Sequence, residues 1–476
     1  MLQRLSSTTG LPDTVRQPQF DRTKLKPGIV HIGIGAFHRA HQAVFTQRAL
    51  EAEFGPWGII AVNLRSAEPV EALANQDGLY SITTRSEAGD QSEVIGATVD
   101  WICAASDRAR VLSALADPAI RLVTITVSEK AYGLDPTTGG LDRAHQAVVA
   151  DLETPNAPVG VLGFLVEGLA LRRAAGLPPY TVLCCDNLPS NGKVVRRLVL
   201  EMAQLRDPAL ADWIAEKGRF PCSMVDRIVP AATDTTRLRA ERLLGTHDAL
   251  AIDTEPFMQW VIEDDFISGR PSWEAGGAIF TDEVEPYEKM KLRLLNGTHT
   301  LLAHLGILAN LDYIRDVMAV PDLAAKARLH MEEVVSTLDP VPGIDLPAYI
   351  DELLARFSNP TIDHRNLQIA LDTTQKLPQR LLAPTVEMLA KGQTAVTTAY
   401  AVGVWIASVK KRADCDDPRR SEVLEAAARI DAIDPAGPFF SIPGLFPPEL
   451  SAASDWRDNV NAAILSFWHS GAAGPR

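Results

Sequence analysis

The stretch Gly28-Ile-Val-His-Ile-Gly-Ile-Gly35 decides the fold predicted for the first half of this chain. Its β-branched residues predict a buried strand, and its last two glycines predict a sharp turn. Residues 38–52 have helical spacing, so a helix should follow the turn at once. A strand, a glycine turn and a helix in this order can hold a pyrophosphate against backbone N–H groups. The candidate cofactor-binding residues here are Gly33, Gly35, Ala36, Phe37 and His38.

The motif is incomplete, because His38 stands where the third glycine of G-x-G-x-x-G would be. A glycine pair after a strand also fits an ordinary turn. A second check is the end of the next strand, where NAD enzymes usually carry an acid for the ribose hydroxyls. This chain has Asn63-Leu64-Arg65-Ser66 there, and Glu68 follows. Arg65 is therefore a cofactor-binding candidate that suits a 2′-phosphate, or else an ordinary solvated residue.

Apolar runs and helical stretches alternate through the first half of the chain. Strands are predicted at residues 57–64, 121–127 and 180–185, and helices at residues 104–116 and 159–175. Nearly continuous apolar strands separated by helices indicate a parallel sheet covered on both faces. After about residue 285 the pattern becomes Leu/Ala-rich and helical. We therefore predict an α/β, Rossmann-like dinucleotide-binding domain over residues 1–284 and a mostly α-helical substrate-binding and catalytic domain over residues 285–476.

Composition excludes several function classes. The 476 residues carry a formal net charge of −14, which disfavours binding to nucleic acid. No apolar run is long enough for a membrane span, the start of the chain lacks the apolar core of a secretion signal, and the five cysteines are scattered. We expect a cytoplasmic protein without a metal site, a monomer rather than an oligomer, whose partner is a small molecule.

Three polar clusters are candidates for chemistry. Ser128-Glu129-Lys130 and Asp186-Asn187 follow two predicted strands, where open α/β sheets bind ligands. Glu288, Lys291, Asn296 and His299 share one broad face of a predicted helix, as a base, a hydrogen-bond donor and a substrate holder would. Each cluster also fits capping residues or a solvated helix face. Tyr287 and Lys291 mimic the Tyr-x-x-x-Lys pair of short-chain dehydrogenases, but they come too late in the chain for that motif.

Taken together, these stretches resemble the long-chain mannitol dehydrogenase family of polyol-specific dehydrogenases. The matching residues are Gly33-Ile-Gly-Ala-Phe-His-Arg-Ala-His-Gln42, Thr126-Val-Ser-Glu-Lys-Ala-Tyr132, Cys185-Asp-Asn-Leu-Pro-Ser-Asn-Gly192, Lys291-x-x-x-x-Asn296-Gly297-x-His299 and Asp372-Thr-Thr-Gln-Lys-Leu-Pro378. The likeness runs from about residue 28 to at least residue 400.

The resemblance implies a metal-independent enzyme that moves a hydride between a nicotinamide cofactor and a sugar alcohol or keto-sugar. The cofactor would be NAD, with NADP possible. Lys291 matches the catalytic lysine, Asn187 and Asn296 match the asparagines that bind the reacting oxygen, and Glu288 matches an acid that helps pass the proton to water. The matching substrate-contacting positions are His299, Asp226 and Lys376, and Glu129 joins them as a candidate.

The resemblance leaves the substrate open. Mannitol 2-dehydrogenases carry an arginine eight residues before the Lys376 position, whereas this chain has Gln368, and residues 364–370 look closer to the fructuronate reductase branch. We expect oxidation of a D-mannitol-like alcohol to a D-fructose-like 2-ketose. The alternative enzyme is a D-mannonate oxidoreductase, with Lys130, Arg365 or Arg380 as the cation for a carboxylate. The alternative of another class is a non-catalytic dinucleotide-binding sensor, which would have no use for a base.

Overall fold

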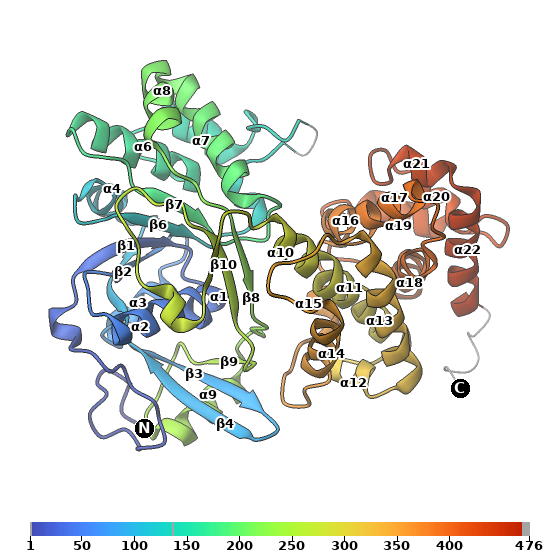
Figure 1. Cartoon of the computed structure of the whole chain (residues 1–476), viewed down its shortest axis with the longest axis horizontal. Coiled ribbons are helices and arrows are strands. Elements are labelled where there is room, and N and C mark those ends of the chain that lie inside the picture. Colours follow the sequence, from blue (N-terminus) through green and yellow to red (C-terminus); the bar gives the residue numbers. More distant parts are fainter. Residues whose placement is uncertain (1, 136–137, 469–476) are drawn as a thin grey trace. The chain divides into compact units, whose positions relative to one another are not determined.

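The computed structural model describes residues 2–135 and 138–468. The chain divides into two compact units, Met1–Val284 and Glu285–Arg476, which we call unit 1 and unit 2. Figure 1 shows unit 1 in blue to yellow-green and unit 2 in yellow to red. Each unit is described by itself.

The centre of unit 1 is a parallel sheet of five strands in the order β5-β2-β1-β6-β7. Every neighbouring pair in it is parallel. The strands are β1 (Pro27–Ile32), β2 (Gly58–Asn63), β5 (Thr98–Cys103), β6 (Leu122–Ile125) and β7 (Thr181–Cys184). The predicted α/β class is confirmed, and four of these five strands lie at predicted places.

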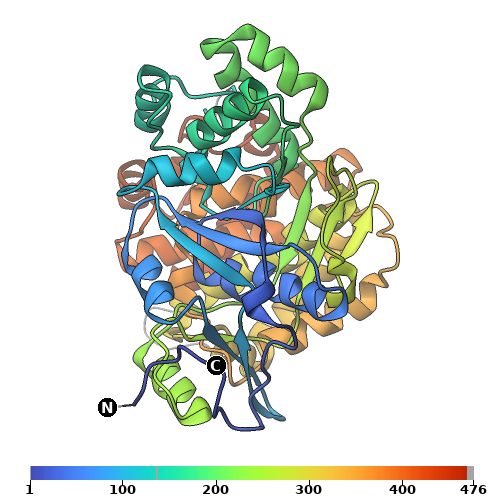
Figure 2. The same ribbon diagram turned by 90° about the vertical axis from the view of Figure 1, so that its left-hand side faces the viewer.

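Helices cover both faces of this sheet, which explains why its strands are apolar throughout (Figures 1 and 2). Val30 and Ile32 pack with the helices α4 (Arg108–Ala116), α6 (Val161–Ala174) and α7 (Asn191–Arg206). Ile29 points to the other face, where α2 (Gln42–Ala52) and α3 (Glu68–Asn75) lie. Because the strands meet helices on both sides, their carboxyl ends are the open edge of the sheet.

Two smaller three-stranded sheets complete unit 1, in the orders β11-β10-β8 and β4-β3-β9. Their strands are β3 (Tyr80–Ser86), β4 (Gly89–Ile95), β8 (Ser223–Asp226), β9 (Ile252–Thr254), β10 (Gln259–Glu263) and β11 (Ile279–Thr281). The remaining helices are η1 (Arg22–Lys24), α1 (Ala36–Ala40), η2 (Glu129–Tyr132), α5 (Gln146–Glu153), α8 (Pro208–Lys217), α9 (Asp234–Leu244) and η3 (Trp273–Gly276). The single helix predicted over residues 38–52 is interrupted at His41. The His41 ring donates from Nε2 to the Gln259 carbonyl, 2.8 Å away.

Unit 2 is helical, as predicted. Its elements are α10 (Glu285–Met290), η4 (Lys291–Asn296), α11 (Gly297–Ala309), α12 (Ile314–Met318), α13 (Pro321–Val334), η5 (Val335–Thr337), α14 (Leu346–Phe357), α15 (Asn366–Ile369), α16 (Thr373–Leu377), η6 (Pro378–Leu382), α17 (Ala383–Ala390), α18 (Val396–Arg412), α19 (Arg420–Ala428), α20 (Gly437–Phe440), α21 (Pro448–Ala452) and α22 (Ser454–Trp468). Two of them, η4 and η6, are π-helical turns. Within the described residues, no helix combines the length and the apolarity needed to cross a membrane.

Candidate active site

The two glycines of the turn after β1 have different reasons to be glycine. Gly33 has a φ of 105°, and a Cβ there would lie 1.9 Å from the Thr126 carbonyl oxygen, so no other residue fits. Gly35 is exposed and extended, and a Cβ on it would meet no heavy atom within 4 Å. Gly33 therefore lets β1 and β6 come together, and Gly35 leaves open space beside the backbone.

His38, at the third position of the motif, has its side chain inside unit 1. It stacks on His31 of β1 with ring centroids 3.3 Å apart. His31 bonds through Nδ1 to Thr124 Oγ1 (2.7 Å), and burial lowers the pKa of both rings, so both are neutral. The stacked rings fill the space between β1 and α1. The candidate cofactor-binding group of His38 is therefore its backbone rather than its ring. Ala36 and Phe37, at the start of α1, are half-buried.

The turn after β2 lies at the same edge of the sheet, because Gly33 N–H donates to the Val62 carbonyl (2.8 Å) of this neighbouring parallel strand. Arg65 and Glu68 are both exposed there. The Asn63 side chain donates to the Ser66 carbonyl (2.7 Å) and closes the turn. No acid takes the position next to the glycine turn, and Arg65 is the charged group closest to the strand end.

Asp186 belongs to one of the polar clusters singled out from the sequence, but its part in joining two loops was not predicted. It follows β7, and its carboxylate accepts hydrogen bonds from Tyr132 OH (2.6 Å) and Val127 N–H (3.0 Å). Burial is the main cause that raises the pKa of Asp186 to about 6. These bonds tie the segment containing Glu129 to the segment containing Asn187, and both of those side chains are exposed. A buried acid that joins two loops was detectable in principle, since the notable Cys185-Asp186-Asn187 run contains it.

Asp226 is brought to the same edge by a second clamp. Asn191 donates through Nδ2 to the Asp186 carbonyl (3.0 Å) and the Ser223 carbonyl (2.8 Å), so the loop after β7 is fastened to β8. Asp226 is the last residue of β8 and is buried. Glu129, Asn187 and Asp226 thus follow or end three strands, β6, β7 and β8, and the Asn191 clamp fastens the loop after β7 to the first residue of β8.

In unit 2, the wide turn η4 begins at Lys291 and ends at Asn296. The Gly297 N–H donates to the Leu292 carbonyl, five residues back, which is the π-helical bond. The helix predicted here is therefore π-helical rather than α-helical between Lys291 and Asn296. Because a π-helical turn holds more residues than an α-helical turn, Asn296 lies closer in angle to Lys291 than α-helical spacing would place it. Both side chains are buried, with 6% exposure each.

Contacts from two sides hold this turn. On one side Arg293 forms a bidentate ion pair with Glu387 (2.6 and 2.7 Å). On the other side Arg380 of η6 donates to the Asn296 carbonyl (3.3 Å), which also accepts from Thr300 Oγ1 (3.0 Å). A Cβ on Gly297 would lie 3.0 Å from the Arg380 carbonyl oxygen, so the glycine permits the close approach of η6.

His299 lies one turn further along, at the start of α11, and is buried. Burial lowers its pKa well below the usual value, and His364, Arg356, Arg380 and Lys291 lower it further, so the ring is neutral. The His299 Nε2 and an atom of the Asn296 amide are both buried without a hydrogen-bond partner among the described residues. Unpartnered buried polar atoms are expensive, so two of them in one place indicate a site for a polar ligand.

The other predicted residues of unit 2 are less buried. Glu288 of α10 is half-buried, and so is Lys376 of α16, whose ammonium donates to the carbonyls of Ile369 (3.1 Å) and Leu371 (2.5 Å). Tyr287 is buried and its hydroxyl donates to the Pro342 carbonyl (2.8 Å), so it has a packing role. Among the described residues, no three His, Cys, Asp or Glu side chains are grouped as metal ligands would be.

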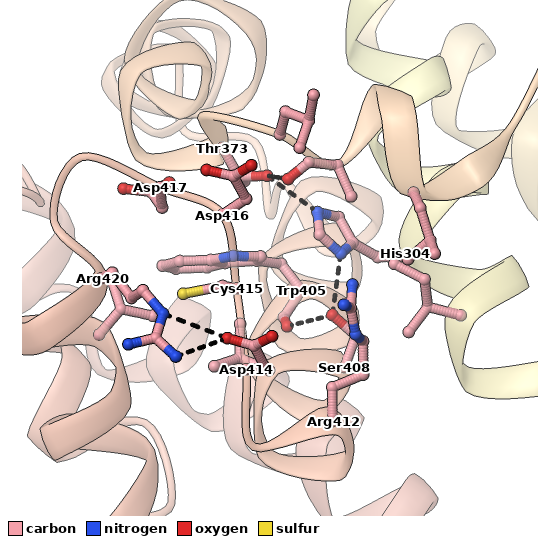
Figure 3. A pocket seen from close by; sticks show the side chains of 16 residues that line it. His304, Thr373, Trp405, Ser408, Arg412, Asp414, Cys415, Asp416, Asp417 and Arg420 are labelled. Carbon is pink, nitrogen blue, oxygen red and sulfur yellow. Dashed lines mark hydrogen bonds and ion pairs between the residues drawn. The ribbon is translucent and has the colours of Figure 1, made fainter.

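Unit 2 also contains a pocket of about 480 Å³ (Figure 3). Its lining includes His304, Trp405, Arg412 and Arg420, and none of the predicted site residues. His304 bonds through both ring nitrogens, to Ser408 Oγ (2.8 Å) and Thr373 Oγ1 (3.2 Å). This ring is fully satisfied by the protein itself, in contrast to His299.

Comparison with protein families accounts for both units. A family model described as the mannitol dehydrogenase Rossmann domain matches residues 27–275. A second, described as the mannitol dehydrogenase C-terminal domain, matches residues 283–431.

Individual proteins are similar over almost the whole chain. The D-mannonate oxidoreductase of Escherichia coli K12 is 40% identical over 96% of each chain. A mannitol 2-dehydrogenase of Pyricularia oryzae is 36% identical over 96% of this chain and 94% of its own. A solved structure of Pseudomonas fluorescens mannitol 2-dehydrogenase, in a ternary complex with NAD and D-mannitol, is similar with a TM-score of 0.91 and 34% identity, over 99% of this chain and 98% of the other.

Proposed function

The chain belongs to the mannitol dehydrogenase family of oxidoreductases, and we propose that it is an NAD(P)-dependent, metal-independent polyol dehydrogenase. Its reaction is the reversible oxidation of a secondary alcohol of a D-mannitol-like polyol to a 2-ketose. The observation that carries this proposal is the wide turn η4, which begins at buried Lys291 and ends at buried Asn296, three residues before buried, neutral His299. An enzyme, unlike a dinucleotide-binding sensor, needs such a buried base.

Lys291 is the general base of the proposed reaction. Its neutral amine takes the hydroxyl proton as the carbinol carbon gives up its hydride. A base of this kind needs a pKa near the working pH, far below the roughly 10.4 of a free lysine. Lys291 is buried, and Arg380 donates a hydrogen bond to the Asn296 carbonyl of the same turn. Half-buried Glu288, three residues earlier, then passes the proton to water.

The remaining roles belong to hydrogen-bonding groups. Asn296 and Asn187 donate amide hydrogens to the developing alkoxide, and one such donor is typically worth about 3 kcal/mol in the transition state. His299, Asp226, Lys376 and Glu129 hold the other hydroxyl groups of the substrate. The unpartnered Nε2 of His299 supports its role as a substrate holder, and the unpartnered Oδ1 of Asn296 would accept a hydrogen bond from a substrate hydroxyl.

The proposed cofactor is NAD, which supplies the hydride acceptor when bound. The residues of unit 1 fit a dinucleotide, because exposed Gly35 leaves a cradle that any Cβ would enter. Gly33, Ala36, Phe37 and the His38 backbone shape the rest of the turn. The solved relative with NAD supports this choice. Arg65, with no acid beside it at the strand end, supports detectable use of NADP.

A D-mannonate oxidoreductase is the second candidate, and one observation favours it. Three cations, Arg356, Arg380 and Lys291, are among the main causes that lower the pKa of His299. Such a set suits the carboxylate of a hexonate as well as a neutral polyol. Of the cations considered from sequence, Arg365 is exposed and lies over the Tyr313 ring, so Arg380 is the better placed.

A substrate screen decides between the two candidates. Purified enzyme is assayed with D-mannitol, D-sorbitol, D-arabinitol, D-fructose, D-mannonate and D-fructuronate, each with both cofactors, by the absorbance of the reduced nicotinamide. The proposal expects the highest kcat/KM for D-mannitol and D-fructose with NAD or NADH. Turnover confined to D-mannonate and D-fructuronate would select the second candidate, and no turnover of any of them would contradict both.

A further inference from the structure

His364 is a polar side chain beside the candidate site. It lies in the loop between α14 and α15, and its ring is perpendicular to that of His299 with centroids 5.0 Å apart. His299 is in contact with Phe357 on another side, at 4.5 Å. His364 is therefore a direct neighbour of a proposed substrate-binding ring, and both belong to unit 2.

The loop holds His364 in a fixed place. Its carbonyl accepts from the Ile314 N–H at 3.1 Å. Two residues later the Asn366 side chain donates to the Leu311 carbonyl at 2.8 Å. A Cβ on Gly306 of α11 would come within 2.1 Å of the Asn366 amide nitrogen. The glycine therefore lets the loop approach α11 closely. These contacts order the backbone on both sides of His364 without using its ring.

The His364 ring is left with an unused polar atom. Its Nδ1 is buried and has no hydrogen-bond partner within the described part of the chain, as is true of the His299 Nε2. His304, on the same helix as His299, shows the opposite state, since both of its nitrogens bond to hydroxyl groups (Figure 3). Two adjacent rings, each with a buried nitrogen that has no partner among the described residues, thus contrast with a satisfied histidine of the same unit.

Both unused nitrogens belong to neutral rings. Burial, together with the charge of Lys376, lowers the pKa of His364 to about 4. A neutral imidazole has one donor and one acceptor nitrogen, and a hydroxyl group can bond to either. Two neighbouring hydroxyls on a polyol chain offer two such groups at a short separation. The pair of rings matches that pattern, and the influence of Lys376 shows that a second proposed substrate holder lies nearby.

We propose that His364 is a further substrate-contacting and specificity-determining residue, whose ring binds a hydroxyl group adjacent to the one held by His299. The inference rests on the proposed function, because it assigns a ligand of the polyol class to that site. It adds a contact that recognises a vicinal diol rather than a single alcohol. A substrate that lacks one of the two hydroxyls would leave a buried nitrogen unpaired.

The test compares substrates as well as variants. Wild type, His364→Asn and His364→Phe are assayed for kcat/KM with D-fructose and with its four monodeoxy analogues beyond the carbonyl carbon, using NADH. His364→Phe should lose about 10- to 100-fold on D-fructose but less than about threefold on the one analogue that lacks the bound hydroxyl. His364→Asn, which keeps a hydrogen-bonding group, should lose less on D-fructose than His364→Phe does.

His304→Asn is the matched control, because it alters another buried histidine of unit 2, one whose hydrogen-bond partners lie in the protein. It should lower the thermal midpoint of unfolding while leaving the ratios between the five sugars unchanged. An equal loss for His364→Phe on every sugar, or a loss below about threefold on D-fructose, would overturn the inference and leave packing, or a water-bridged role, for this ring. Failure of wild type to reduce any sugar would instead contradict the proposed function, since the His364 inference is judged only by ratios to wild type.

Discussion

The glycine turn of unit 1 and the π-helical turn of unit 2 are the two short segments to which we assign the binding of a reacting partner, and they differ in kind. The glycine turn would act through its backbone, where Gly33 meets a neighbouring strand and Gly35 leaves space. The turn η4 would act through the side chains of Lys291 and Asn296, the residues at its two ends. A position that has no room for a Cβ requires glycine, so it can be recognised in the sequence. A π-helical turn requires no particular residue type, so it cannot be recognised in this way.

The largest expected effect comes from breaking the glycine turn. Gly33→Ala places a Cβ 1.9 Å from a backbone oxygen at a positive φ, so the free energy of unfolding should fall by about 3 kcal/mol or more. Gly35→Ala should leave that free energy within about 0.5 kcal/mol of wild type and weaken NADH binding about tenfold. Urea unfolding and fluorescence titration with NADH measure the two quantities. If both variants behaved alike, the separate roles of the two glycines would be wrong.

A smaller effect is expected from widening the space between η4 and η6. Gly297→Ala brings a Cβ within 3.0 Å of the Arg380 carbonyl, so the turn must shift by a few tenths of an ångström. A shift of this size near the reacting atoms should lower kcat about tenfold. The Kd for NADH should not change, because Gly297 belongs to unit 2. Steady-state kinetics together with NADH titration checks this, and a parallel loss of NADH affinity would argue against it.

The sequence predicted the parallel sheet and the helical unit because period and apolar content are local properties. It also singled out Lys291, Asn296 and His299, since their residue types suit the chemistry. It named Asp186 only within a polar cluster and missed its part in joining two loops, which depends on Tyr132 and Val127 reaching it from another strand end. It likewise missed the interruption at His41, a residue whose ring bonds to the distant Gln259 carbonyl. Features fixed by contacts between remote segments were thus beyond a reading of local pattern.

Arg65 gives a still smaller effect, confined to cofactor choice. Its side chain is exposed, so solvent weakens any pairing with a 2′-phosphate. Arg65→Ala should lower kcat/KM with NADPH about fivefold and with NADH less than twofold, in parallel assays of reduction of the same sugar. An equal loss with both cofactors would show that Arg65 is an ordinary strand-end residue, and Ser66 or Glu68 would then be tested.

The smallest expected effect is that of removing metal ions, for which we expect no change in turnover. Because the proposed base is a lysine, exhaustive dialysis against EDTA should leave kcat unchanged within error. Activity that is lost to the chelator and regained only on addition of zinc would replace Lys291 with a metal-bound base.

The most direct test of the central claim is the turnover of Lys291→Ala at saturating substrate, with and without an added primary amine. The account predicts a loss of kcat of about a hundredfold or more, an unchanged Kd for NADH, and partial recovery of turnover as the concentration of amine rises. If Lys291→Ala kept more than about a tenth of wild-type turnover, Lys291 would not be the base. The wide turn η4 would then have to position something other than the group that takes the proton.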